Sequence, residues 1–322
     1  MLYHHDHMNL LGNKDRFDGI KKQFSNHVDI VQAFLFFLLG IWYLGLSCIN
    51  PSNESWLLPT PNRLDHAVAQ LNWEFYRSAP IFQWPPVLIP DLGVGWGTVY
   101  VPFSSGSLFG VVLKYFNFFL PDNFQFLGIW LLFSFTMLGF MSVRLVRVIT
   151  TNPWQLWLGS SLLALSPTIF YRIGVLGHFE LSAHWLLFAA ILAYFNPDFR
   201  GRSWALICII TLVVNVYLFA IVFAVFLASV AKHLQVGLDR LRVFKKSVVV
   251  VSLIFTSFAV FGFLEYRENA RGLGFFRSNL LSYIYPNFAL GGAVSGSFSR
   301  LLDWTGVFLN RPFIAFEREG FN

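Results

Sequence analysis

Long apolar runs separated by short polar connections dominate the chain. Such runs predict membrane-spanning helices, because about 20 apolar residues cross the ~30 Å hydrocarbon core of a bilayer. Five predicted spans stand out, and they cover residues 28–49, 124–143, 154–171, 182–195 and 247–264. We therefore expect an all-α fold, a polytopic transmembrane helical bundle.

The stretch 203–231 has no charged residue and is too long for one span but short for two. As a single helix it would measure about 43 Å at ~1.5 Å per residue. Basic residues flank it on both sides, with Arg200 and Arg202 before it and Lys232 after it. Because such clusters gather on the cytoplasmic side, the chain should cross an even number of times between them. We predict two short spans that turn near Asn215, hence seven spans in all; a single span is the alternative.

A segment of mixed polarity, residues 50–123, connects the first two spans. It contains apolar residues at helical spacing, which predict an amphipathic helix lying on the outer membrane face: Leu64, Val68, Leu71 and Phe75. A second apolar run, 106–120, is too short for a span and carries Lys114 at its centre, where a charge costs about 3 kcal/mol in a bilayer. We predict a second outer juxtamembrane helix from which Lys114 reaches water.

The predicted spans divide the chain into three regions. Residues 1–27 form a basic cytoplasmic tail, residues 28–265 the transmembrane module, and residues 266–322 a C-terminal segment on the outer side.

Composition supports a membrane protein and argues against two other classes. Of the 322 residues, 56% are hydrophobic and 12% are charged, whereas about a quarter are charged in soluble domains. The net charge of +6 could suggest nucleic-acid binding. The basic residues lie in short clusters between apolar runs, however, so we expect a lipid bilayer and no nucleic acid as a partner.

The first amphipathic helix carries the first candidate site. Asp65 begins this helix and is the candidate catalytic acid; alternatively, it only complements the helix dipole. Trp73 and Tyr76 follow, and their rings could anchor the helix at the membrane interface or stack on a sugar.

A second group of titratable residues lies between the third and fourth predicted spans: Arg172, His178, Glu180 and His184. Such a group at a membrane edge is a functional-site hypothesis, with snorkelling to the interface as the alternative. A divalent metal is conceivable here, although the His/Glu spacing provides no third fixed ligand. Further along, Arg271 lies in a charged run that is either a solvated surface or a docking site for phosphate.

Several motifs together resemble a family of bacterial polytopic membrane proteins, which is in turn similar to the GT-C glycosyltransferase superfamily. The resemblance rests on Asp65-His66, Asn72-Trp-Glu-Phe-Tyr-Arg77, Asn123-Phe-Gln-Phe-Leu-Gly-Ile-Trp130, Leu165-Ser-Pro, Gly177-His-Phe-Glu-Leu-Ser-Ala-His-Trp185, Ser278-Asn-Leu-Leu-Ser282 and Glu319-Gly-Phe321.

The GT-C resemblance implies seven spans and a catalytic acid near the start of a long first outer loop, which assigns the role of general base to Asp65. It implies transfer of a sugar from a polyprenyl-phosphate donor to a glycan or lipid acceptor, with inversion, on the outer face of the bacterial inner membrane. Arg172 and His178, together with Lys114 or Arg271, would neutralise the phosphate leaving group.

Departures from the family pattern support a second hypothesis. Ser104 stands where the family tends to have a second acid, and Asn215-Val-Tyr217 stands where it tends to have His-Pro-Tyr. The chain also stops at the Glu-Gly-Phe motif, after which family members continue. On this basis we also consider a fragment or an inactive GT-C-like protein that binds or presents lipid-linked glycans. A transporter is less favoured, because no inverted repeat or charged midplane span is visible.

Overall fold

The computed structural model describes residues 5–58, 64–92, 98–100, 107–173, 177–236 and 239–264. Side chains are described from residue 27 onward, except those of Leu64, Asp65, Thr98, Val99, Thr168, Tyr171 and Val236. The chain divides into two units, Met1–Tyr266 and Arg267–Asn322. All that follows concerns the first unit, because the second lies outside the described residues.

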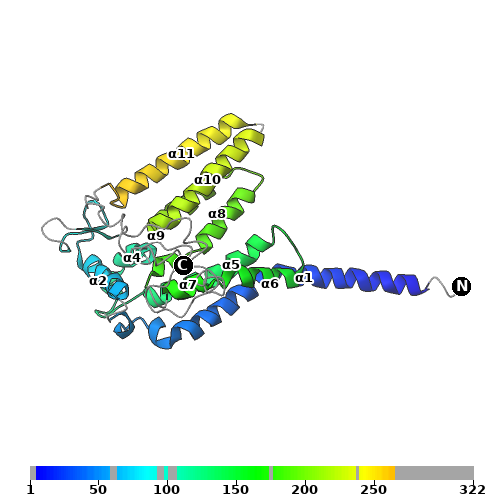
Figure 1. The fold of residues 1–322 in the computed structure, drawn as a ribbon, viewed down its shortest axis with the longest axis horizontal. Coiled ribbons are helices and arrows are strands. Elements are labelled where there is room, and N and C mark those ends of the chain that lie inside the picture. Colours follow the sequence, from blue (N-terminus) through cyan, green and yellow to red (C-terminus); the bar gives the residue numbers. More distant parts are fainter. Residues whose placement is uncertain are drawn as a thin grey trace, which may run out of the picture. The chain divides into compact units, whose positions relative to one another are not determined.

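Helices form nearly all of the described structure (Figure 1). The long helices and their companions are α1 (His5–Ile49), α5 (Leu127–Val146), α6 (Pro153–Ala164), α7 (Pro167–Tyr171), α8 (Trp185–Phe195), α9 (Gly201–Val214), α10 (Val216–Val236) and α11 (Arg240–Val260). Shorter elements fill the connections, and these are η1 (Ser55–Leu57), α2 (Leu64–Ser78), α4 (Ser107–Lys114), η2 (Asn117–Phe119) and η4 (Phe179–Ser182). Strands β1 (Leu88–Ile89) and β2 (Thr98–Val99) pair antiparallel, with Leu88 opposite Val99.

Four helical segments are long and apolar enough to cross a membrane: His27–Ile49, Leu127–Val146, Val216–Gln235 and Arg240–Val260. Two further apolar helices, Trp185–Phe195 and Gly201–Val214, are shorter. The predicted span 154–171 is divided into α6 and α7, because Pro167 begins α7 and a proline disfavours helical geometry in the residue before it. The structure thus confirms an all-α fold in which four helices are long and apolar enough to span a membrane.

Asn215 breaks the apolar stretch 203–231, as predicted. Its backbone is extended, and its side-chain oxygen accepts hydrogen bonds from the backbone N–H groups of Tyr217 at 2.9 Å and Leu218 at 3.0 Å, which caps α10. The chain then reverses, since the rings of Trp204 in α9 and Phe226 in α10 lie 5.5 Å apart between centroids. The alternative of one continuous helix is therefore wrong.

Polar contacts gather the basic residues at one end of the bundle. Asp29 of α1 lies 3.6 Å from Arg144 and 3.5 Å from Arg147, at the end of α5. The Lys232 ammonium donates to the Tyr194 carbonyl at 2.8 Å, and Lys246 similarly reaches the carbonyl of Phe199 at 3.1 Å. We call the region formed by these residues and the turn 194–200 the basic end. Because these basic residues lie at one end of the bundle, the prediction that they share one side is confirmed.

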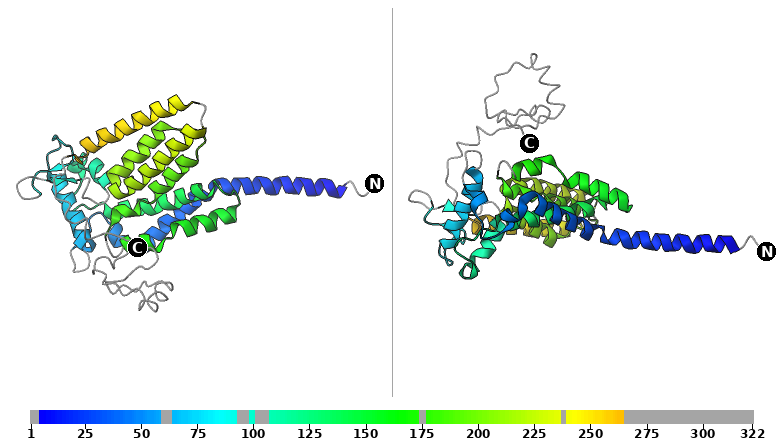
Figure 2. Two further views of the ribbon diagram at one scale, coloured as in Figure 1. Left: turned by 45° about the horizontal axis from the view of Figure 1, so that its top comes forward. Right: turned by 90° about the horizontal axis from the view of Figure 1, so that it is seen from below.

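The connecting helices α2 and α4 lie at the opposite end of the bundle, which we call the roof end together with η1, η2 and η4 (Figures 1 and 2). The Ser107 hydroxyl at the start of α4 donates to the Val213 carbonyl at the end of α9. Close contact between α1 and α5 at this end requires glycine, because a Cβ on Gly128 would collide with the backbone of Cys48. The roof therefore packs directly on the ends of the bundle helices.

The run 106–120 is shorter and more irregular than predicted. Helix α4 ends at Lys114 and a turn leads to η2, where Phe118 and Phe119 are about three-quarters exposed. Exposed aromatic rings of this kind suit a membrane interface. Lys114 itself does not reach water: its side chain is only 1% exposed, so the snorkelling prediction is wrong.

Candidate functional site

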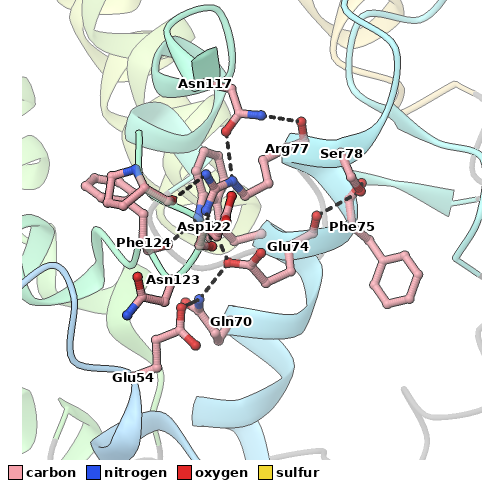
Figure 3. Close-up of polar contacts among 12 residues, drawn as sticks. Glu54, Gln70, Glu74, Phe75, Arg77, Ser78, Asn117, Asp122, Asn123 and Phe124 are labelled. Carbon is pink, nitrogen blue, oxygen red and sulfur yellow. Dashed lines mark hydrogen bonds and ion pairs between the residues drawn. The ribbon is translucent and has the colours of Figure 1, made fainter. Parts of the chain in front are cut away.

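Helix α2 is fixed at its C-terminal end by Arg77, whose guanidinium is buried (Figure 3). Its Nε donates to Asn117 Oδ1 at 2.8 Å, and its terminal nitrogens donate to the carbonyls of Asp122 at 2.9 Å and Pro121 at 2.8 Å. The Asn117 side chain donates back to the Arg77 carbonyl at 3.1 Å. We call these residues the Arg77 clamp; it holds α2 against the segment that leads into α5.

A polar bridge ties the middle of α2 to the connection after α1 (Figure 3). The amide nitrogen of Gln70 donates to a carboxylate oxygen of Glu54 at 3.1 Å and to one of Glu74 at 3.0 Å. Burial raises the pKa of the Glu74 carboxyl, while Arg77, 3.7 Å away, acts in the opposite direction. The bridge and the clamp together leave α2 little freedom to move.

Trp73 belongs to the core of the roof. It is fully buried, its indole nitrogen donates to the Phe124 carbonyl at 2.8 Å, and its ring meets that of Phe126 edge-on at 5.1 Å. A sugar cannot stack on a ring enclosed in this way. Both polar and apolar parts of this tryptophan are used for packing, so we reassign it from substrate binding to the core.

Tyr76 is likewise fully buried and has both ring faces covered. Tyr100 stacks on it with centroids 4.0 Å apart, and the Lys114 ammonium lies 4.1 Å from its ring centroid. Tyr76 thus contacts a cation rather than a sugar. Its burial raises the pKa of its own phenol.

Lys114 is a buried cation whose ammonium lies over the ring of Tyr76. Its nitrogen has no hydrogen-bond partner among the described residues. Desolvation lowers the pKa of Lys114 to about 8, because burial disfavours the charged form. We call Lys114, Tyr76 and Tyr100 the Lys114 cage. A buried ammonium with unused donors is suited to bind an anion that reaches it.

The first turn of α2 packs against the loop between α7 and α8. The His66 ring meets the Phe179 ring edge-on at 4.9 Å, and Trp56 lies beside Phe179 at 5.6 Å. Gly177 has φ +72°, and a Cβ there would come within 2.5 Å of His66 Nδ1. We call these four residues the His66 junction. It brings together two regions that the sequence offered as separate candidate sites.

The predicted cluster of titratable residues, Arg172, His178, Glu180 and His184, lies immediately beside this junction. The backbone N–H of His178 donates to the Arg172 carbonyl at 3.1 Å, and the Trp130 indole holds the Phe179 carbonyl at 3.0 Å. Burial lowers the pKa of Arg172, and the charge of Glu180 partly offsets that effect. Arg172 and Glu180 are therefore electrostatically coupled.

His184 is neutral at physiological pH. Burial, reinforced by the charge of Arg172, lowers the pKa of His184 to about 4. It directly precedes α8. His184 can donate or accept a hydrogen bond here, but it cannot supply the positive charge for a phosphate at neutral pH. Arg172 is left as the strongest cation of the group.

Three of the predicted residues have side chains that lie outside the described part of the structure. Asp65 is the second residue of α2, in the same turn as His66, but its side chain lies outside the described residues. Arg271 and Ser104 also lie outside them. Within the ranges that the structure covers, no three His, Cys, Asp or Glu side chains group to hold a metal ion.

Sequence reasoning missed the contribution of Gly177, of Trp56 and of the Arg77 clamp. A glycine beside His178 was visible, but only the left-handed backbone explains why it is needed there. The Arg77 clamp depends on carbonyls of a distant loop, which no local pattern reveals.

A family model described as a domain of unknown function, DUF6311, matches residues 33–322. The chain belongs to the DUF6311 family. No curated protein and no solved structure matches it. The DUF6311 match covers all the described residues of the roof end, so the His66 junction, the Arg77 clamp and the Lys114 cage all lie within the family domain.

Proposed function

We propose that this DUF6311 protein is a membrane glycosyltransferase of the GT-C type, which transfers a sugar from a polyprenyl-phosphate donor to a glycan or lipid acceptor with inversion. The observation that carries the proposal is the His66 junction. Through it, the turn of α2 that contains Asp65 lies beside the loop that carries Arg172, Glu180 and His184.

The reaction needs a base and a cation, and the two segments that meet at the junction carry a candidate for each. Asp65 would take the proton of the acceptor hydroxyl as the hydroxyl oxygen attacks the anomeric carbon, a role commonly contributing ~10²- to 10⁴-fold. The bond from that carbon to the phosphate oxygen breaks, and Arg172 would stabilise the negative charge on the departing phosphate. His184, being neutral, would orient groups by hydrogen bonding.

The rigid roof suits this chemistry. The Arg77 clamp and the Gln70 bridge fix α2, and rigid elements hold catalytic groups more precisely than loops do. Lys114 adds a second cation under the roof, held against Tyr76. It would contribute positive potential near the phosphate.

The proposal includes a finer topology. We infer seven crossings, formed by α1, α5, the pair α6–α7, α8, α9, α10 and α11, with the roof on the periplasmic side of the bacterial inner membrane. The basic end would then face the cytoplasm, in agreement with the tendency of lysine and arginine to remain there. Contacts at the two ends support this alternation, because Asp29 meets Arg144 at one end and Gly128 meets Cys48 at the other.

The experiment that tests the function uses membranes containing the full chain and polyprenyl-phosphate sugars labelled in the sugar. We expect label to move from the lipid to an endogenous acceptor, above the level in membranes without the protein. Label that stays on a protein-bound donor, with none transferred, would instead favour the non-catalytic protein that presents lipid-linked glycans. Absence of both transfer and binding would contradict both functions.

A further inference from the structure

A second candidate site lies at the basic end, away from the roof. There a cavity of about 230 Å³ opens between α5, α8 and α9. Its lining comprises Met141, Arg144, Ala189, Leu192, Ala193, Asn196, Arg200, Ser203, Trp204 and Ile207. None of these residues takes part in the proposed transfer.

The polar part of the lining is positively charged. Arg144, on α5, and Arg200, just before α9, approach the cavity from different elements. The Arg144 side chain lies over the Phe140 ring at 4.4 Å and is half exposed, while Arg200 is exposed. Asp29 lies within ion-pair distance of both Arg144 and Arg147, and Asp198 belongs to the same turn as Arg200 but does not line the cavity. The charged residues of the lining are therefore both arginines.

The turn that carries Arg200 is held in place. Lys232 of α10 bonds the Tyr194 carbonyl and Lys246 of α11 bonds the Phe199 carbonyl, so both ends of the turn are fixed by neighbouring helices. The side-chain oxygen of Asn196 accepts from the backbone N–H of Asp198 at 3.0 Å. Arg200 thus projects from a preorganised turn, which lowers the entropic cost of binding an anion.

Apart from Asn196 and Ser203, the rest of the lining is apolar. Methyl and methylene groups of Met141, Leu192 and Ile207 form its walls, and the adjoining Leu206 on α9 is 61% exposed. Exposed apolar side chains on a helix of a membrane bundle face lipid. A ligand that fills this site needs an anionic head and an apolar body.

We propose that this cavity binds the phosphate head of an anionic membrane phospholipid, with Arg144 and Arg200 on the phosphate and the acyl chains along α8 and α9. Arginine forks match phosphate oxygens, and basic pockets between transmembrane helices are suited to such heads. The proposal is independent of the glycosyltransferase function, because it uses other residues at the other end of the molecule. A soluble phosphate ester shares the head-group chemistry, and the experiment separates the two.

The test measures lipid retention by the full-length protein, purified in a neutral detergent, using native mass spectrometry. Phosphatidylglycerol, phosphatidylcholine, and inorganic phosphate are added separately. We expect the wild type to retain phosphatidylglycerol in preference to phosphatidylcholine and to be unaffected by inorganic phosphate. Arg200→Gln should weaken phosphatidylglycerol binding about fivefold, the effect of one basic residue near an anionic lipid surface.

Two further variants make the result decisive. Arg202→Gln removes an exposed arginine two residues away that does not line the cavity, so it should retain the lipid like the wild type. Ala193→Phe fills the cavity without removing charge and should also weaken retention. Equal retention of both lipids, or equal losses in Arg200→Gln and Arg202→Gln, would overturn the site. Displacement of phosphatidylglycerol by millimolar inorganic phosphate would overturn the lipid as its occupant.

Discussion

The Arg77 clamp and the Lys114 cage each bury one cation in the roof, but only the cation of the clamp makes hydrogen bonds to described residues. Three of the Arg77 nitrogens donate to oxygens of the opposing loop, at 2.8 to 2.9 Å. Lys114 has only the ring of Tyr76, and its ammonium has no hydrogen-bond partner in the described part of the chain. A saturated buried cation stabilises a fold, whereas an unsaturated one opposes folding. This difference assigns Arg77 a structural role, and it is the reason why we propose Lys114 as a binding residue.

Loss of the clamp should have the largest effect on stability. Arg77→Ala removes the guanidinium and leaves the carbonyls of Pro121 and Asp122 without their buried donor. We expect a loss of about 4–5 kcal/mol in the free energy of unfolding, because three hydrogen bonds from a charged donor are lost, each worth about 1.5–3 kcal/mol. Thermal unfolding in detergent measures it. Arg202→Gln, at an exposed position, is the control and should leave the melting temperature unchanged. A stable Arg77→Ala protein would show that the clamp is not structural.

Lys114→Met should act in the opposite direction. Removing an unpaired buried ammonium and keeping an apolar side chain of similar length should raise the free energy of unfolding by about 1–4 kcal/mol at pH 7. The same change should slow sugar transfer if Lys114 helps to bind phosphate. A destabilised Lys114→Met protein would contradict the comparison, because it would mean that the ammonium has a stabilising partner.

The pH dependence of the free energy of unfolding tests whether the Lys114 amine causes this stability difference. The pKa of this amine falls from 10.5 to about 8 in the folded protein. Between these pH values the unfolded chain binds more protons, so the stability of the wild type should rise from pH 8 to pH 10.5. The gain amounts to about 3 kcal/mol at ~1.4 kcal/mol per pKa unit. In Lys114→Met this rise should be absent, which unfolding curves at several pH values would show.

Gly177→Ala should have a smaller effect, confined to the His66 junction. A methyl group at φ +72° is unfavourable by about 1–2 kcal/mol, and it would meet His66 Nδ1 at 2.5 Å. We expect a modest fall in melting temperature and a larger fall in transfer, because the α2 turn that carries Asp65 would be pushed from the loop. Gly159→Ala on α6 is the control, since the atoms nearest to its added methyl belong to one valine side chain, at 3.2 Å and beyond. Equal activity in both variants would argue against the junction as part of the site.

Much of the bundle was predictable from the sequence, because apolar length and basic clusters act locally. The break at Asn215 and the common side of Arg144, Lys232 and Lys246 followed from the length of an uncharged run and from the positive-inside rule. The burial of Lys114 did not follow, since it depends on packing against Tyr76, which belongs to another segment.

The residues of the candidate site could be predicted from the sequence, but not the contacts that bring them together. The titratable residues between α7 and α8 and the acid at the start of α2 were visible in the sequence. The contact of His66 with Phe179 joins residues far apart in the chain, and no local periodicity encodes it. The same reason explains Trp73 and Tyr76, whose aromatic character suggested a sugar platform and whose packing places them in the core.

The measurement that tests the central claim most directly is sugar transfer by Asp65→Asn. The amide keeps the size of the side chain but cannot accept the proton, so the account predicts a fall in transfer of at least about 10²-fold with an unchanged melting temperature. Asp91→Asn, at an exposed aspartate of the same connection between α1 and α5, is the matched control and should remain active. Full transfer activity in a folded Asp65→Asn protein would contradict the assignment of Asp65 as the general base.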